Sequence, residues 1–408
     1  MGGYIKQVFY DGARHLNCVM SIPSLEKNLM NKPRRMAIQR LIDAAGSAVL
    51  RPLRRPFPDI RSLLVVRTGP SADVFLSTAI LPHLRAAFPK ADIRFMTGAN
   101  ADVCLKSNPY IDGVILCGRP ATKGLGGAPG MFVSAVASFF KAIHRMRRAP
   151  YDLVVNLSTS PGYSIPALYS GRPRYMIGFS TAGCGFLLDK AVENRHGSHE
   201  AERLSEMLSA LGIGASRRVV KPEFTLSRAV ELECRELLDE LGLSDREPFV
   251  LLHTGSGAAN ALWRKERWQE VVDKIGRQYG LRAVVYDTVY GNIRGCIKLP
   301  ALVSFEVLAA AAKMAELFIG IEPLHAYLAA SFGTPSVLIR SGINDGACIR
   351  PPGSSLSIVR KNLPCAPCLR KRGCPGMSCM EITSEECMME VRKPLDSLIS
   401  FKVVRLRR

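Results

Sequence analysis

The 408-residue sequence contains no uninterrupted apolar stretch of the roughly 18 residues that a membrane-spanning helix requires. Its first residues lack the compact apolar core of a signal peptide. Lys6 stands where a myristoylation pattern requires Ser or Thr. The sequence therefore predicts a cytoplasmic protein without a spanning helix.

Acidic residues are scarce, because 55 Lys and Arg face 35 Asp and Glu, for a net charge of +20. The excess gathers near both ends of the chain, at Arg34, Arg35, Arg40, Arg51, Arg54, Arg55, Lys402, Arg405, Arg407 and Arg408. Such a field attracts phosphate groups. The sequence has neither a recognition helix nor the aromatic and glycine pattern of an RNA-binding sheet, so nucleic acid is not the expected partner. Two interpretations remain: a solvated basic surface, or peripheral association with an anionic membrane on its cytoplasmic face.

The length exceeds what one hydrophobic core usually organises, so two domains are expected. Hydrophobic residues make up 47% and charged residues 22%, as in ordinary globular proteins. We divide the chain into a basic N-terminal extension (1–58), an N-terminal domain (59–222) and a C-terminal domain (223–408) that ends in a cysteine-rich segment (365–387) and a helix.

Strand and helix patterns alternate in both domains. The first series consists of SLLVVRT, DIRFMTG, GVILCG, YDLVVNLS and RYMIGF, with helices at 73–88 and 131–148. The second series starts with PFVLLHTG and has TPSVLIR as its last strand. Continuous apolar runs are typical of parallel strands that are buried on both faces. The pattern predicts two doubly wound, Rossmann-like α/β domains with a cleft between them, and ligands that bind at the carboxyl ends of the strands.

Three loops that follow strands carry candidate residues. Asp73 follows a glycine turn, either as a catalytic carboxylate or as a helix-terminal acid favoured by the macrodipole. The small residues of HTGSGAAN (253–260) let backbone N–H groups approach a diphosphate, although a plain loop has the same composition. Glu322 and His325 lie where a strand gives way to a helix. They either contact a sugar hydroxyl, or cap and pack the helix.

Three segments carry a resemblance that reaches beyond these local patterns: R-T-G-P-S-A-D (67–73), W-R-K-E-R-W (263–268) and G-I-E-P-L-H-A-Y-L-A-A (320–330). From about residue 61 to 398 the chain resembles glycosyltransferase family nine, which includes the ADP-heptose:lipopolysaccharide heptosyltransferases. The resemblance implies the GT-B fold. It also implies inverting transfer, without a required cofactor, from an ADP-heptose-like nucleotide sugar to a lipopolysaccharide or another lipid-linked glycan acceptor.

The same resemblance implies roles for individual residues. Asp73 occupies the position of the general base, and Arg67 and Ser71 in the same turn are the candidate acceptor contacts. The candidate donor contacts are His253, Thr254, Gly255, Ser256, Lys265, Glu322, His325 and Tyr327.

The sequence departs from the family pattern at the donor site. Ala261 stands where the family has a phosphate-binding lysine, and either Lys265 or Arg264 is a candidate replacement. Leu324 and Tyr327 stand in place of a glycine and a histidine. An alternative function is therefore a catalytically degenerate GT-B relative that binds nucleotide sugars or glycans. Signatures of a nucleotide-sugar epimerase are not apparent.

Five of the twelve cysteines cluster near the C-terminus. Cys365, Cys368, Cys374 and Cys379 suit a tetrahedral zinc site, and Cys387 follows them. A reducing cytoplasm disfavours disulfides, so the alternatives are a structural metal or free thiols.

Overall fold

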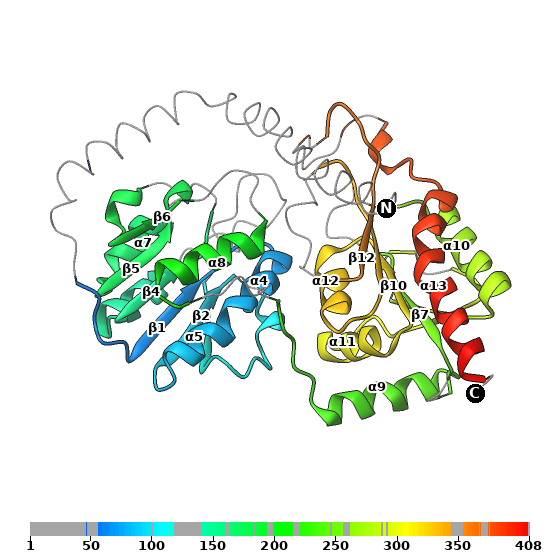
Figure 1. Cartoon of the computed structure of the whole chain (residues 1–408), viewed down its shortest axis with the longest axis horizontal. Helices are drawn as coiled ribbons and strands as arrows, with labels where there is room; N and C mark the ends of the chain where they lie inside the picture. The colour runs from blue at the N-terminus through cyan, green and yellow to red at the C-terminus, as the bar shows by residue number, and fades with distance from the viewer. Residues whose placement is uncertain are drawn as a thin grey trace, which may run out of the picture. The chain divides into compact units, whose positions relative to one another are not determined.

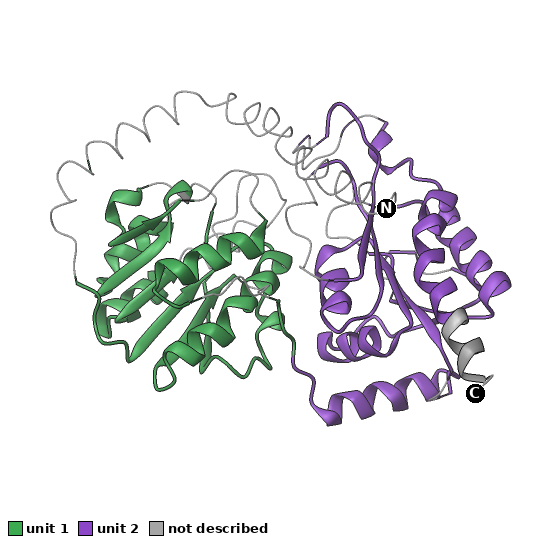
Figure 2. Cartoon of the chain, in the orientation of Figure 1, with its two compact units in different colours: residues 1–224 green, residues 225–408 purple. Residues whose placement is uncertain are grey.

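The chain divides into two compact units, Met1–Phe224 and Thr225–Arg408 (Figure 2). The computed structural model describes residues 46, 56–98, 101–117, 140–159, 164–182, 184–193, 199–214, 221–244, 247–255, 262–286, 289–290, 293–343, 354–366, 368, 374 and 376–406. The basic extension predicted for residues 1–58 thus lies almost wholly outside the described residues. The sequence placed the domain boundary after residue 222.

The first unit contains a six-stranded sheet in which every pair of neighbours is parallel, in the order β3-β2-β1-β4-β5-β6 (Figure 1). The strands are β1 (Ser62–Val66), β2 (Asp92–Thr97), β3 (Gly113–Leu116), β4 (Leu153–Asn156), β5 (Tyr175–Phe179) and β6 (Lys190–Val192). The helices are α4 (Ser71–Ser77), α5 (Leu81–Ala87), α7 (Ser164–Ser170) and α8 (Glu200–Ala210), with a further helical segment at 140–148.

Alternate residues of β1 enter two different cores, which explains why the whole strand is apolar. Leu63 and Val65 pack into the core that includes side chains of α4, α5 and α8. Leu64 and Val66 pack into the core that includes side chains of α7 and the segment 140–148. Burial on both faces is what a parallel sheet covered by helices demands. The helix predicted at 73–88 is divided into α4, a 3₁₀ turn (Thr78–Ile80) and α5.

The second unit repeats this plan with the order β12-β11-β10-β7-β8-β9, again entirely parallel. Its strands are β7 (Phe249–His253), β8 (Arg282–Tyr286), β9 (Cys296–Lys298), β10 (Leu317–Gly320), β11 (Ser336–Ile339) and β12 (Leu356–Val359). Its helices are α9 (Arg228–Glu240), α10 (Lys265–Tyr279), α11 (Phe305–Met314), α12 (Pro323–Ser331) and α13 (Ser384–Leu406). Side chains of α10 and α13 share a core with β7 and β10.

The second series does not end at TPSVLIR, and that prediction was wrong. That run forms β11, and β12 pairs with it further along the chain. The short outer strands β6 and β9 were missed as well. Their burial alternates or is incomplete, so they lack the continuous apolar run that identifies a central strand.

Both sheets have a position where the direction of strand order reverses. In the first unit it lies between β1 and β4, and in the second between β7 and β10. Ligands of open α/β sheets bind at the carboxyl ends of the strands that flank such a point. The fold therefore directs attention to the residues that follow β1, β4, β7 and β10.

Candidate functional site

Asp73 lies in the first turn of α4, just beyond the carboxyl end of β1. Its backbone N–H donates to the carbonyl of Pro70, and its side chain is 30% exposed. The carboxylate oxygen Oδ2 lies 3.5 Å from Nη2 of Arg67. A partly exposed carboxylate at this edge of the sheet is accessible to a ligand and is held beside a fixed positive charge.

Arg67 is the first residue after β1 and is only 5% exposed. Its Nη1 donates to the carbonyl of Leu157, and Nη2 also lies 3.3 Å from Oε1 of Glu200. The buried Nε has no hydrogen-bond partner among the described residues. The carbonyl of Leu157, just after β4, thus holds the guanidinium on one side, and Nη2 lies between two carboxylates. The Nε–H has no partner among the described residues.

Glu200 completes this network and was missed by the sequence analysis. It is the first residue of α8 and is 3% exposed, and Arg203 one turn later donates to it through Nε at 2.9 Å. Burial by itself raises the pKa of a carboxyl, but the charges of Arg67 and Arg203 outweigh that effect and lower the pKa of Glu200. The carboxyl is therefore ionised at neutral pH. The available signal was an acidic residue at the start of a segment with helical spacing, where the macrodipole favours negative charge.

Gly69 keeps the space beside this network open. A Cβ atom at this position would lie 3.3 Å from Oδ2 of Asp73 and 3.8 Å from Nε of Arg67. Ser71, the other predicted acceptor contact, lies two residues before Asp73 and accepts a weak hydrogen bond from Cys104 Sγ at 3.7 Å through its carbonyl. The structure therefore brings the three residues predicted in the first unit into one turn.

The neighbouring strand ends are unusually rich in unsatisfied polar atoms. Thr97 ends β2 and Asn156 ends β4, the two strands that flank β1. Thr97 Oγ1, Asn156 Nδ2 and Ser158 Oγ are all buried without a hydrogen-bond partner in the described part of the chain. Each such atom costs about 1–3 kcal/mol. Their position at one sheet edge suits a polar ligand.

In the second unit, two predicted histidines stack on each other. His253 ends β7, and its ring lies 4.0 Å from that of His325 on α12, at an interplanar angle of 21°. Tyr286 at the end of β8 lies 5.3 Å from His253. Withdrawal from water, together with the neighbouring His253, lowers the pKa of His325 well below its usual value. His325 is therefore neutral at pH 7 and offers hydrogen bonds without a positive charge.

The other predicted donor contacts differ in how accessible they are. Thr254 and Gly255 follow His253 and are buried, and Tyr327 is fully buried on α12. Glu322 precedes α12 and makes no side-chain cap to that helix within the described residues. Ser256 lies outside the described residues.

The tryptophan and arginine motif that contains Lys265 binds the tail of the chain. Trp263 Nε1 donates to the carbonyl of Ile382 at 2.7 Å. Arg264 contacts one carboxylate oxygen of Glu381 at 2.5 Å, and Arg267, three residues further on, contacts the other at 2.6 Å. Lys265 is the half-buried first residue of α10. Arg264 is thus paired with Glu381 at the surface, and Arg264 and Lys265 both stay predicted cations.

Arg340 is a second residue that the sequence analysis did not single out. It follows β11 directly, and its N–H donates to the carbonyl of Val359. Gly320 of β10 pairs with Leu338 of β11 and with His253 of β7, so Arg340, Glu322 and Gly255 each come two residues after a paired position at the carboxyl end of the sheet. Its buried Nε lacks a hydrogen-bond partner among the residues that the structure describes. An arginine directly after a buried apolar strand was the signal.

The predicted zinc ligands differ widely in exposure. Cys365 is exposed, Cys368 and Cys374 are half-buried, and Cys379 is buried. Among the described residues, which include these four, no three Cys, His, Asp or Glu side chains are arranged to hold a metal ion. Cys387 lies in the core, where burial raises the pKa of its thiol to about 12 and suppresses thiolate chemistry. The zinc site stays a prediction.

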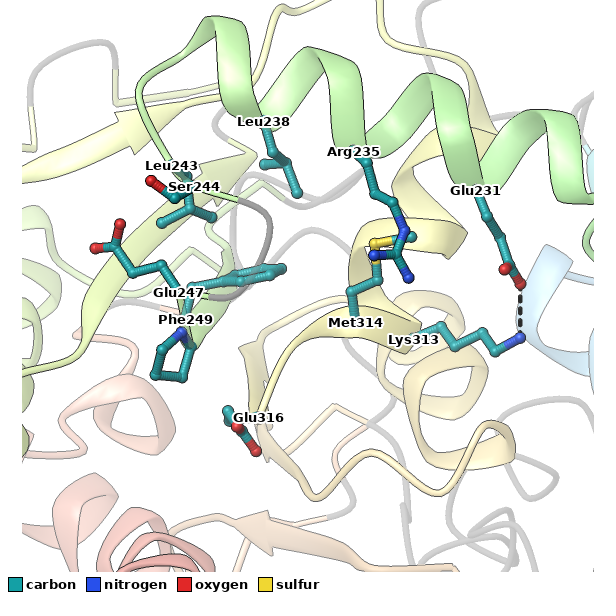
Figure 3. A pocket seen from close by; sticks show the side chains of 11 residues that line it. Glu231, Arg235, Leu238, Leu243, Ser244, Glu247, Phe249, Lys313, Met314 and Glu316 are labelled. Atoms are coloured by element: carbon teal, nitrogen blue, oxygen red, sulfur yellow. Dashed lines mark hydrogen bonds and ion pairs between the residues drawn. The ribbon is translucent and has the colours of Figure 1, made fainter.

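A pocket opens at the amino ends of the strands of the second sheet (Figure 3). It lies where β7 begins and β10 is about to begin, and α9 forms one wall. Lys313 and Glu231 form an ion pair of 2.7 Å there. None of the predicted donor contacts lines this pocket, which is at the amino ends of the strands.

Comparison with known families settles the broad assignment. Residues 139–376 match the model of glycosyltransferase family 9 (heptosyltransferase). The chain belongs to glycosyltransferase family 9. Among the relatives of this glycosyltransferase, the lipopolysaccharide heptosyltransferase 3 of Escherichia coli K12 is 24% identical over 299 residues, 68% of this chain and 82% of that protein. No helix among the described residues is long and apolar enough to span a membrane.

Solved structures of family members share the fold. A family 9 glycosyltransferase from Veillonella parvula superposes with a TM-score of 0.66 at 18% identity, covering 84% of this chain and 99% of that one. The E. coli ADP-heptose lipopolysaccharide heptosyltransferase II gives 0.58 at 14% identity, covering 82% and 99%. The E. coli heptosyltransferase WaaC with ADP-2-deoxy-2-fluoro heptose gives 0.59 at 14%, covering 81% and 99%. The predicted pair of Rossmann-like domains of the GT-B kind is thereby confirmed.

Proposed function

We propose that this glycosyltransferase moves a heptose or a similar sugar from an ADP-activated donor to a lipopolysaccharide or another lipid-linked glycan, with inversion at the anomeric carbon. The first unit binds the acceptor and the second binds the donor. Support comes from family membership, from the curated relative named as a lipopolysaccharide heptosyltransferase, and from the related structure with an ADP-heptose analogue.

The observation that carries the proposal is the turn of Arg67, Gly69 and Asp73 at the point where strand order reverses. In the proposed reaction, Asp73 takes the proton of an acceptor hydroxyl. At the same time the oxygen of that hydroxyl bonds to the anomeric carbon. The bond from that carbon to the diphosphate breaks, and ADP leaves with the electron pair. A single attack from the opposite side inverts the configuration. A general base of this kind contributes about 10²–10⁴-fold to the rate.

The leaving diphosphate needs positive charge or N–H donors as its own charge develops. We propose that Arg340 supplies the cation that the family places at residue 261, where this chain has alanine. Its buried Nε, which has no hydrogen-bond partner in the described part of the chain, and its place directly after β11 at the carboxyl end of the sheet support this role. Lys265 is a second cation for the same group, and neutral His325 serves as a hydrogen-bond donor or acceptor.

The transfer proposed here uses no cofactor, and zinc at the cysteine cluster would be structural. The metal content of protein purified without chelator tests that site, and less than half an equivalent of bound metal would exclude it. The basic ends of the chain support peripheral association with an anionic membrane. Salt-dependent sedimentation with vesicles that contain anionic phospholipid, but not with neutral vesicles, tests the association.

The decisive experiment measures ADP release from ADP-heptose. The acceptor is lipopolysaccharide from cells that lack the related heptosyltransferase 3. Asp73→Asn is expected to lower kcat by at least about 100-fold. The matched control is Asp59→Asn, an exposed aspartate outside the site. Turnover that survives Asp73→Asn would remove the base assignment and leave the transferase activity standing.

The donor site has its own test. Arg340→Ala is expected to weaken ADP-heptose binding by about tenfold, which is seen as a smaller ligand-induced rise in the thermal midpoint. Arg360→Ala, at the end of the adjacent strand β12, is the matched control. An unchanged rise for Arg340→Ala means that other groups bind the diphosphate.

The second candidate function is a degenerate relative that binds nucleotide sugars or glycans without transferring them. Ala261, Leu324 and Tyr327 favour it, because each departs from the family pattern at the donor side. Calorimetric binding of ADP-heptose without turnover on any lipopolysaccharide acceptor would support this function.

A further inference from the structure

We infer that Glu200 is a positioning residue, which holds Arg67 in place and offsets its charge so that Asp73 keeps enough basicity to act as the base. The inference rests on the proposed function, because it concerns how the same carboxylate is tuned. It adds a residue from α8 to a site that the sequence places entirely in the turn after β1.

The geometry sets a problem that Glu200 solves. Asp73 Oδ2 lies 3.5 Å from the buried guanidinium of Arg67. A lone positive charge at this distance lowers the pKa of a carboxyl by about 1–3 units. A carboxylate with so low a pKa is a weak proton acceptor, since a general base works best with a pKa near the operating pH. Arg67 alone would therefore fix Asp73 in position and weaken it as a base.

The position of Glu200 matches this need. The same nitrogen of Arg67 that faces Asp73 lies 3.3 Å from Glu200 Oε1. Glu200 is almost completely buried, so water screens its charge very little. Arg203 binds the other oxygen of Glu200 and fixes the carboxylate, and the N-terminal end of α8 favours its negative charge. Arg67 is thus shared between two carboxylates instead of being directed wholly at Asp73.

Other ionisable groups lie on the elements packed against α4, and their contacts differ from those of Glu200. These groups are Asp102, Cys104 and Lys106 on and after the 3₁₀ turn Asp102–Cys104, and His199, Glu202 and Glu206 on α8. Burial raises the pKa of Cys104 to about 12, so it is neutral. The ring of His199 accepts from the N–H of Ala201, and exposed Glu202 accepts from the N–H of His199. Among the groups of α8, Glu200 is the one for which the structure records an ion pair with Arg67.

The test compares the pH dependence of kcat/KM for Glu200→Gln and wild type, measured as ADP release from ADP-heptose with the same lipopolysaccharide acceptor. Loss of the negative charge leaves Arg67 acting on Asp73 alone. The acid limb of the profile is therefore expected to move down by about one pH unit, and kcat at pH 8 to fall by about tenfold. Glu202→Gln, which removes an exposed charge from the same turn of the helix, is expected to leave the limb where it is.

A double variant is compared with Arg67→Gln if Glu200→Gln is poorly folded, because Glu200→Gln leaves the charges of Arg67 and Arg203 without their carboxylate. Arg67→Gln with Glu200→Gln removes one charge of each sign. Its acid limb is expected below that of Arg67→Gln alone, because the double variant also lacks the negative charge of Glu200. Folding of each variant is checked by its thermal midpoint.

The results separate this inference from the proposed function. An acid limb that stays at the wild-type pH in folded Glu200→Gln, or one that moves equally in Glu202→Gln, overturns the positioning role. If Glu200→Gln does not fold, an acid limb at the same pH in Arg67→Gln and in the double variant overturns it. Turnover that survives Asp73→Asn overturns the assignment of the base instead.

Discussion

Replacing Gly69 by alanine tests whether the acceptor hydroxyl approaches Asp73 through the space beside this glycine. The added Cβ atom would lie 3.3 Å from Oδ2 of Asp73 and 3.8 Å from Nε of Arg67. An acceptor oxygen must come within about 2.6–3.2 Å of the carboxylate for proton transfer. For an acceptor that approaches on this side, the methyl group occupies the position of that oxygen, and the acceptor is displaced by a distance on the order of 1 Å.

A displacement of that size costs about 100-fold in rate. The fold should tolerate the change, because Gly69 is not in the left-handed region and the three atoms nearest to the added Cβ belong to the side chains of Asp73 and Arg67. Substitution of glycine by alanine at a compatible position even stabilises a protein by about 0.4–1 kcal/mol. We therefore expect kcat/KM to fall by about 100-fold while the thermal midpoint changes by only a few degrees.

The assay is ADP release from ADP-heptose, with acceptor varied at saturating donor. The rise in thermal midpoint that ADP-heptose produces should match that of wild type, since the substitution is in the first unit. Gly214→Ala is the matched control, because that glycine is exposed and a Cβ there would meet nothing within 4 Å. Wild-type kcat/KM in Gly69→Ala would show that the acceptor reaches Asp73 from another side, and would refute the reasoning.

Three further predictions concern the second unit. The hydrogen bond from Lys361 lowers the pKa of Glu386 to about 2, which is below its value in the unfolded chain. The carboxylate therefore stabilises the fold fully above about pH 4.5, and this stabilisation is lost as the pH falls toward 2. In urea unfolding, Glu386→Gln should cost roughly 1 kcal/mol at pH 7, after allowance for solvent screening, and progressively less in acid; a constant difference would contradict this. Trp263→Phe should cost about 2–4 kcal/mol at neutral pH in the same measurement, because it removes buried volume and leaves the carbonyl of Ile382 without its donor; a change under 1 kcal/mol would be inconsistent. Because the pKa of His325 is well below its usual value, the KM for the donor should change less than about twofold between pH 6 and 8. A change in this KM with a midpoint near pH 6.5, absent in His325→Asn, would contradict the neutral state of His325.

The sequence predicted the central strands and the outer strand β3, but missed the outer strands β6, β9 and β12. Strands β1, β7 and β10 are buried on both faces, so their residues form short continuous apolar runs. The outer strands β6, β9 and β12 are only three or four residues long and are partly exposed. Their identity depends on pairing with a neighbouring strand, which local composition does not encode.

What the sequence determined by itself is the repeated strand and helix pattern, and the turn from Arg67 to Asp73 in which neighbouring residues must lie close together. Only the tertiary structure decided that Glu200 reaches Arg67, and that β11, which Arg340 follows, pairs with β10, which Glu322 follows. These contacts join segments far apart in the chain. The charge that each carboxylate experiences depends on distances of a few ångströms, and the packing of helices and strands fixes those distances.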